Sequence, residues 1–196
     1  MTKLIKTLAA TTAALSLSCM VASAEIVIDE ARFGGAIAQP EWTGQDREQD
    51  QWVVTAEVLF SPVNIDFLNV FEGNDSVLAQ ALVNPRPHIG GLFNFNSDGT
   101  SSLYTGLTWH FPMGDVFFLE ATFGFGVNDG ETETDPGSNR ANLGSNILFR
   151  ESIALGVNIT ETTTFTLQAS HQSHANLAGD DNYGLTNFGG KLGFKF

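Results

Sequence analysis

Three features of the sequence predict an all-β protein, folded as an eight-stranded antiparallel transmembrane β-barrel of the outer-membrane type. Apolar and polar residues alternate with a period of two over stretches of about ten residues, which cross a bilayer when tilted. An export signal precedes these stretches, and the last of them ends on an aromatic residue, Phe196. No segment after the signal is apolar enough for a transmembrane helix, which leaves strands as the means of spanning.

Residues 1–24 have the form of a secretory signal peptide. Two lysines come first, an uncharged apolar run follows, and Ala22-Ser23-Ala24 offers small residues for cleavage. We therefore expect residues 25–196 to form one exported barrel domain. The single cysteine, Cys19, would leave with the signal, so we expect neither disulfides nor thiol chemistry in the exported domain.

The charge balance argues against nucleic acid as a partner. The chain carries 9 Lys and Arg against 22 Asp and Glu, a formal net charge of −13, and loss of the signal lysines would make it more acidic. Such a surface has no basic stripe to neutralise phosphates. With 16 Phe and 42% hydrophobic residues, the chain is also too apolar to be a disordered polyanion.

Eight segments carry the period-two pattern, six of them cleanly and the first two less so. In residues 102–111, for example, Leu103 and Leu107 share one face while Tyr104 and His110 share the other. The predicted strands are 26–37, 52–60, 87–96, 102–111, 116–128, 143–158, 163–173 and 183–196, with a bulge expected in the first.

The polar face of each strand is expected to fill the barrel interior, while the apolar face meets lipid. His88 and His110 lie on interior faces, where packed polar residues are a better interpretation than metal ligands, and we expect neither a metal nor a cofactor. A hydrogen-bonded interior network is predicted from Tyr104, Glu120, Asn146, Arg150, Gln168 and Lys191.

Residues 61–83 do not fit the simple pattern of such a barrel. With both chain ends in the periplasm, this segment falls at the end where connections are normally short turns. A short helix is expected within it, and the sequence assigns it no function.

The segment "TTFTLQASHQS" places two polar residues on an apolar face. Its odd-numbered residues run from Phe165 through Ala169 to His171 and Ser173, so the last two should face lipid near the outer rim. In one interpretation the strand has already reached the head groups, where His and Ser cost little; the pattern alone favours this. In the other they are a base and a nucleophile, because alternate strand residues lie about 6.5–7 Å apart at Cα and an imidazole can close that gap.

The segments "SHQSHANLAGDDNYGLTNFGGKLGFKF", "RPHIGGLFNF", "YTGLTWHFPMGDVFFLE" and "LGSNILFRESIALGVNIT" resemble the PagL-type lipid A 3-O-deacylase (acyloxyacyl hydrolase) family. The resemblance covers residues 86–196 well and the first two strands loosely. It implies a cofactor-free ester hydrolase of the Gram-negative outer membrane that removes an acyl chain, the 3-O chain, from lipid A in the outer leaflet. Ser173 would be the nucleophile, and His171 the general base and then the general acid.

The same resemblance implies lipopolysaccharide as the partner in the membrane and the barrel-assembly machinery as the partner during insertion. It leaves open whether the barrel forms a homodimer. The alternative function, from a different class, is a catalytically silent barrel with a structural or adhesion role.

Three positions depart from the motif of that family. His174 stands where the family has an asparagine after the serine, and Asn176 where it has a glycine; both positions help to form the oxyanion hole. Backbone N–H groups there could still bind an oxyanion. Thr186 occupies the position of the family's acidic residue, and a threonine can accept a hydrogen bond from an imidazole but cannot stabilise its charge as a carboxylate does.

Strand register offers a substitute for the missing acid. If the turn after the sixth predicted strand centres near residues 160–161, antiparallel pairing brings Glu151 beside or diagonal to His171 on the lipid-facing side. We hypothesise that Glu151 orients His171. The competing interpretation is a bulge that turns Glu151 inward toward Arg150 or Lys191.

Overall fold

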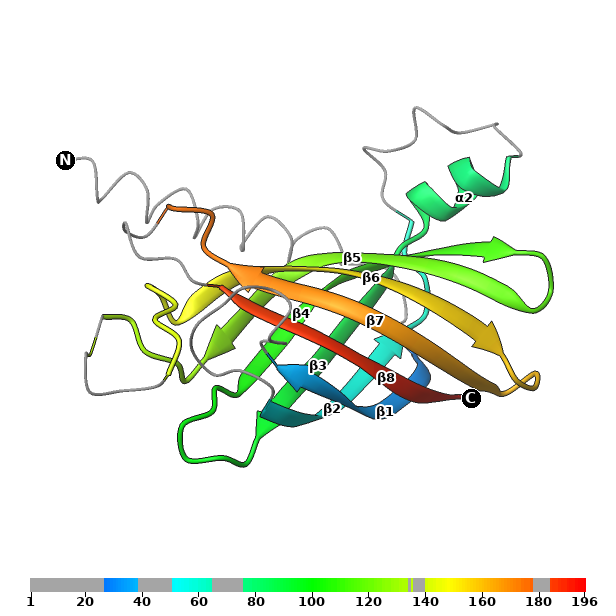
Figure 1. Cartoon of the computed structure of the whole chain (residues 1–196). Helices are drawn as coiled ribbons and strands as arrows, with labels where there is room; N and C mark the ends of the chain where they lie inside the picture. The colour runs from blue at the N-terminus through cyan, green and yellow to red at the C-terminus, as the bar shows by residue number, and fades with distance from the viewer. Residues whose placement is uncertain (1–26, 39–50, 65–75, 134, 136–139, 178–183) are drawn as a thin grey trace.

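The eight strands close into a single antiparallel barrel in the computed structural model (Figure 1). The structure describes residues 27–38, 51–64, 76–133, 135, 140–177 and 184–196, so the predicted signal peptide lies outside the described residues. Each strand pairs with its neighbours in the sequence, and β1 pairs with β8 to complete the ring. The strands are β1 (Ile28–Ala38), β2 (Gln51–Phe60), β3 (Arg86–Asn94), β4 (Ser102–Met113), β5 (Phe117–Asn128), β6 (Ile147–Asn158), β7 (Thr163–Ser173) and β8 (Leu185–Lys195).

All eight predicted strands are confirmed, with one boundary that differs clearly. The predicted bulge is present, because the β1–β2 register shifts between Ile28 and Glu30. β6 begins at Ile147 rather than at residue 143. The preceding residues turn instead: Gly144 has a φ of 67°, and its N–H donates to Asn142 Oδ1 at 3.0 Å.

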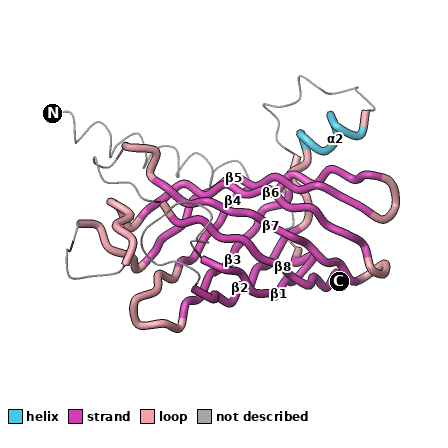
Figure 2. The backbone as a smooth tube through the Cα atoms, viewed as in Figure 1, coloured by secondary structure: helices cyan, strands magenta, loops and turns pink. Residues whose placement is uncertain are grey.

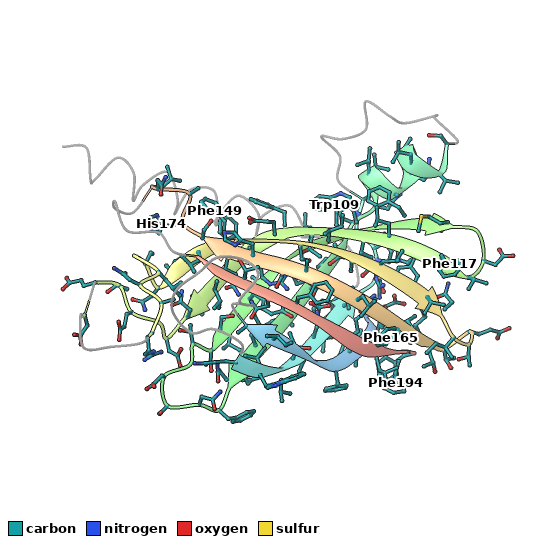
Figure 3. The ribbon with its side chains drawn as sticks, viewed as in Figure 1. Trp109, Phe117, Phe149, Phe165, His174 and Phe194 are labelled. Carbon is teal, nitrogen blue, oxygen red and sulfur yellow. The ribbon has the colours of Figure 1, made fainter. Side chains whose placement is uncertain are left out.

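The two faces of the wall differ as the alternation predicts. Outward residues are mostly apolar and are exposed or half-exposed; Figure 3 shows Phe117, Phe165 and Phe194 on the outside of the wall. Inward residues are buried and are mostly polar or small. A wall with an apolar outside and a polar inside is the inverse of a soluble protein, and it suits a bilayer.

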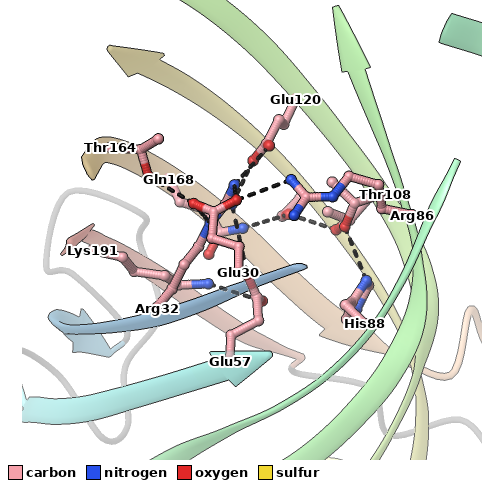
Figure 4. A network of polar contacts seen from close by, with 12 residues as sticks. Glu30, Arg32, Glu57, Arg86, His88, Thr108, Glu120, Thr164, Gln168 and Lys191 are labelled. Atoms are coloured by element: carbon pink, nitrogen blue, oxygen red, sulfur yellow. Dashed lines mark hydrogen bonds and ion pairs between the residues drawn. The ribbon is translucent and has the colours of Figure 1, made fainter. Parts of the chain in front are cut away.

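Arg32 lies at the centre of the interior and binds carboxylates from two strands (Figure 4). Its Nε and Nη2 donate to Glu30 at 2.9 and 3.0 Å, and its Nη1 and Nη2 donate to Glu120 at 2.6 and 2.8 Å. Arg86 Nη1 also donates to Glu30 Oε2, at 2.9 Å, so this oxygen accepts from both arginines. Each buried carboxylate thus meets at least one guanidinium, and this pairing offsets the cost of removing both charges from water.

A second group of interior contacts surrounds Glu57. Its Oε2 accepts hydrogen bonds from Lys191 Nζ and Tyr104 OH, each at 3.0 Å. The Arg150 guanidinium lies 3.9 Å from the centre of the Tyr104 ring, and the Gln168 amide donates to Ser152 Oγ at 2.8 Å. The predicted network is therefore confirmed for Tyr104, Glu120, Arg150, Gln168 and Lys191.

The prediction for Asn146 is wrong. This residue is exposed just before β6 begins, and its amide donates to Asn128 O at 3.1 Å. The two interior histidines are packed polar residues: His88 Nδ1 lies 3.0 Å from Thr108 Oγ1, and His110 Nδ1 lies 3.1 Å from Glu120 Oε1. In the part of the chain that the structure describes, no cluster of three or more metal-ligating side chains occurs.

One end of the barrel carries two short turns and the other carries loops (Figure 2). Gly114, with a φ of 74°, makes the tight β4–β5 turn at the end where the C-terminus lies (Figure 1). The helix predicted within residues 61–83 is confirmed at this same end as α2 (Val77–Val83). Among the described residues, no helix has the length and apolar character needed to cross a membrane.

Replacing Arg32 with Met should lower the free energy of unfolding by about 3–5 kcal/mol, because Glu120 then loses its buried cation. Urea unfolding of the barrel in lipid vesicles measures this. Arg140→Met is the matched control: Arg140 meets the exposed Asp129 carboxylate at 3.4 Å and donates to the carbonyls of Gly99 and Asp129, so its loss should cost less, about 1–2 kcal/mol. Equal effects of the two substitutions would contradict a stabilising role for the interior pairs.

Candidate active site

The residues predicted for the site come together on the outward face of three neighbouring strands. His171 of β7 pairs with Glu151 of β6 on one side and with Thr186 of β8 on the other. Ser173 lies two residues further along β7, opposite Phe149. The register that the sequence analysis inferred for Glu151 is therefore confirmed.

The His171 ring is held by Thr186. Its Nδ1 lies 2.9 Å from Thr186 Oγ1, within hydrogen-bond distance. When Nδ1–H is the donor, Nε2 carries the lone pair and can accept a proton, as a general base requires. Thr186 thus fills the position of an orienting group for the imidazole, with a neutral oxygen in place of a carboxylate.

The Ser173 side chain is half-buried, and the Nδ1 hydrogen bond of His171 is made with Thr186 rather than with Ser173. It stands on the same face as the imidazole, one pleat nearer the end of the strand. Alternate residues on one face of a strand lie about 6.5–7 Å apart at Cα, a gap that an imidazole and a hydroxyl can span.

Glu151 faces outward and is exposed. The β5–β6 and β6–β7 ladders run without a register shift through this residue, so the competing interpretation of an inward bulge is wrong. Its proposed interior partners, Arg150 and Lys191, are already engaged with Tyr104 and Glu57. Within the described residues Glu151 has no hydrogen bond or ion pair, and the bond from His171 Nδ1 goes to Thr186 instead.

A strained turn follows Ser173 directly. Leu177 N–H donates to His174 O at 2.9 Å, and the two residues between them, Ala175 and Asn176, have φ of 50° and 59°. Positive φ at both central positions is typical of a type I′ turn and is costly for alanine. The His174 side chain is buried at the rim (Figure 3).

This turn and Gly184, the residue before β8, contribute two features that the sequence analysis did not name. The Ala175 backbone N–H, two residues from Ser173, has no backbone acceptor among the described residues. Gly184, with a φ of 69°, packs against the imidazole: a Cβ there would lie 2.5 Å from His171 Cε1. The glycine of "NYGL" was the only signal in the sequence for this contact.

Similar proteins can now be compared with this fold and site. The model of the family described as "Lipid A 3-O-deacylase (PagL)" matches residues 80–195. The crystal structure of the outer membrane enzyme PagL has a TM-score of 0.58 at 15% identity, over 87% of this chain and 100% of that chain. The N-terminal barrel of Pseudomonas aeruginosa OprF has a TM-score of 0.51 at 9% identity, over 86% of this chain and 98% of that one.

A de novo designed transmembrane β-barrel is also similar, with a TM-score of 0.50 at 6% identity over 87% of this chain and 98% of the design. No curated protein matches the chain in sequence. The fold is therefore that of an eight-stranded outer-membrane β-barrel. Because the family model matches more than half of the residues, the chain belongs to the PagL lipid A 3-O-deacylase family.

Replacing Ala175 with Gly should raise the free energy of unfolding by about 1 kcal/mol, because glycine adopts the positive φ of this turn without strain. Urea unfolding in vesicles measures the change. Ala169→Gly, in the regular part of β7, is the control and should destabilise the barrel. A loss of stability in Ala175→Gly would show that the turn is not strained.

Proposed function

We propose that the protein is a lipid A deacylase, an ester hydrolase that releases the 3-O acyl chain of lipid A in the outer leaflet of the Gram-negative outer membrane. The observation that carries this proposal is the outward-facing row of Ser173, His171 and Thr186 on a barrel of the lipid A deacylase family. An active site on the outside of the wall suits a substrate that arrives within the membrane. We also propose that the signal peptide at residues 1–24 directs export and that residues 25–196 form the mature barrel. The barrel-assembly machinery would insert this barrel into the membrane.

The reaction follows from the roles of the two side chains. As Ser173 Oγ attacks the ester carbonyl carbon, its proton passes to His171 Nε2. Collapse of the tetrahedral intermediate breaks the bond to the sugar oxygen, which takes the proton from the imidazolium and leaves the acyl chain on Ser173. Water then attacks the acyl-enzyme, with His171 accepting its proton and returning it to Ser173 Oγ as the fatty acid departs.

The negative charge that develops on the carbonyl oxygen needs donors close to Ser173. The Ala175 N–H has no backbone acceptor among the described residues, and the backbone at His174 and Asn176 belongs to the same turn. We assign these three positions to the oxyanion region. Donors fixed on a backbone turn stabilise the transition state because they need no reorganisation when the charge appears.

Two residues would share the work that one carboxylate does in a serine-histidine-acid triad. Thr186 fixes the tautomer of His171 through the 2.9 Å contact to Nδ1. Glu151, the cross-strand partner of His171, has its Cβ about 4.5–5.5 Å from that of His171 by strand geometry. Its negative charge favours the imidazolium that forms during the reaction, so we propose Glu151 as an electrostatic partner rather than a hydrogen-bonded one.

Ser173→Ala should abolish deacylation. Mass spectrometry of lipid A from outer membranes that contain the wild-type protein should show the loss of one hydroxyacyl group, and the variant should leave lipid A intact. An unchanged lipid A mass with a folded wild-type barrel would contradict the enzyme and favour the silent structural or adhesion barrel. Activity that survives Ser173→Ala would instead remove this serine from the mechanism.

Thr186→Val should lower the deacylation rate about tenfold, because the Nδ1–H of His171 loses its acceptor. Glu151→Gln keeps the size and polarity of the side chain but removes the charge, and should lower the rate about fivefold. Thr186→Glu, which restores a carboxylate at the family position, should raise it. If Glu151→Gln leaves the rate of release unchanged while Thr186→Val lowers it, Glu151 has no catalytic part.

A further inference from the structure

The connection between β2 and β3 is the feature of the barrel that the proposed reaction does not use. At the same end, the β4–β5 and β6–β7 connections are tight turns, whereas this one runs from residue 61 to residue 85. Barrels of this class keep their periplasmic connections short. A long connection that contains a helix at this end therefore needs an explanation of its own.

α2 is fixed to the outside of the barrel wall. Trp109, an outward residue of β4, donates its indole N–H to Leu82 O at 3.1 Å, as Figure 3 suggests from the position of this side chain beside α2. Ala79 and Val83, four residues apart on the helix, are buried. The helix also has defined ends, because Ser76 Oγ accepts from Ala79 N–H and the Asn84 amide donates to Gln80 O.

The opposite face of α2 is apolar and uncovered. Val77 and Leu78 are 58% and 61% exposed. Ala81 and Leu82, both half-buried, follow them by four residues, so the four side chains form one patch on adjacent turns, with Val77 and Leu78 as its exposed part. The helix "VLAQALV" has no charged residue and a single polar one, Gln80. A helix that is apolar on nearly all sides is typical of a membrane environment rather than of a surface in water.

The apolar patch on α2 lies next to the lipid-facing wall of the barrel, which indicates lipid as its occupant. Trp109 belongs to the outward face of β4, which continues to the exposed Met113 at the same end of the barrel. The patch is thus continuous with the wall that meets lipid. A second copy of the chain is a poorer occupant, because a stable protein interface needs about 800 Å² on each side and a two-turn helix cannot provide it.

We propose that α2 is an interfacial anchor that lies in the periplasmic leaflet, with Val77 and Leu78 among the acyl chains of phospholipids. The Trp109 indole holds the helix against the wall, and tryptophan is a residue that favours this level of a bilayer. The anchor fixes the depth and tilt of the barrel in the membrane. It does not depend on the proposed catalytic function.

Site-directed spin labelling tests the anchor directly. A nitroxide is attached at Leu78→Cys in a Cys19→Ser background, and the barrel is refolded in dilauroyl phosphatidylcholine vesicles. Labels at Ile153→Cys, on the lipid-facing wall, and at Asp98→Cys, in an exposed loop, calibrate the two environments. We expect the label at position 78 to collide with oxygen more often than with a water-soluble nickel chelate, as at position 153.

Preferential contact with the chelate, as at position 98, would overturn the proposal, since α2 would then lie in water. An immobile label that neither reagent reaches would overturn it as well, because protein would then cover the patch. Neither readout involves deacylation, so loss of the catalytic proposal and loss of the anchor are distinguishable.

Trp109→Phe tests the attachment of the helix to the wall. Phenylalanine keeps the aromatic ring and removes the N–H donor, so the fraction of detached helix should rise about fivefold. The spectrum of the label at position 78 should show a matching gain in mobility, with folding checked by the heat-dependent gel shift of the barrel. An unchanged spectrum in the folded variant would mean that the indole does not hold α2.

Discussion

The pairing of β1 with β8 is the constraint on which the rest of the structure depends. It closes the ladder, so that no strand edge is left with unpaired N–H and C=O groups in a medium that cannot hydrogen-bond to them. Closure also gives every strand one face toward the barrel interior and one face toward the outside. Both the interior ion pairs and the outward row at His171 follow from that division, because consecutive residues such as Ser170 and His171 must point in opposite directions.

The interior solves a problem that a soluble core does not face. Eight strands enclose a space too narrow for a water channel, and the sequence fills it with charged and polar side chains rather than with aliphatic ones. Such a core is stable only when each charge meets a partner, as Glu30, Arg32 and Glu120 do. The filled interior supports a wall in which neighbouring strands pair in one register.

Much of the fold could be predicted from the sequence because the period of two is a direct physical signature of a strand with unlike faces. The same pattern gave the pairing of Glu151 with His171, since one turn position sets the register of two whole strands. Asn146 was misplaced because alternation happens to continue past the true start of β6, where Gly144 turns the chain. The place of Thr186 beside His171 was open to prediction from the family motif, since both residues lie on paired strands. The Ala175 N–H and the packing of Gly184 depend on how the turns beside β7 and β8 meet in space, and loops have no periodicity that would predict them.

The outward position of Ser173 and His171 has a further consequence for how a substrate would be selected. A pocket selects its substrate by shape. On a convex wall in a bilayer, the surrounding lipid rather than the protein encloses the other side of the substrate. In the proposed reaction the membrane holds the ester bond at one depth and restricts its diffusion to two dimensions. The bilayer itself therefore helps to bring the ester bond close to Ser173. Recognition then depends largely on depth in the bilayer: the ester bond that is cut is the one that lies at the depth of Ser173.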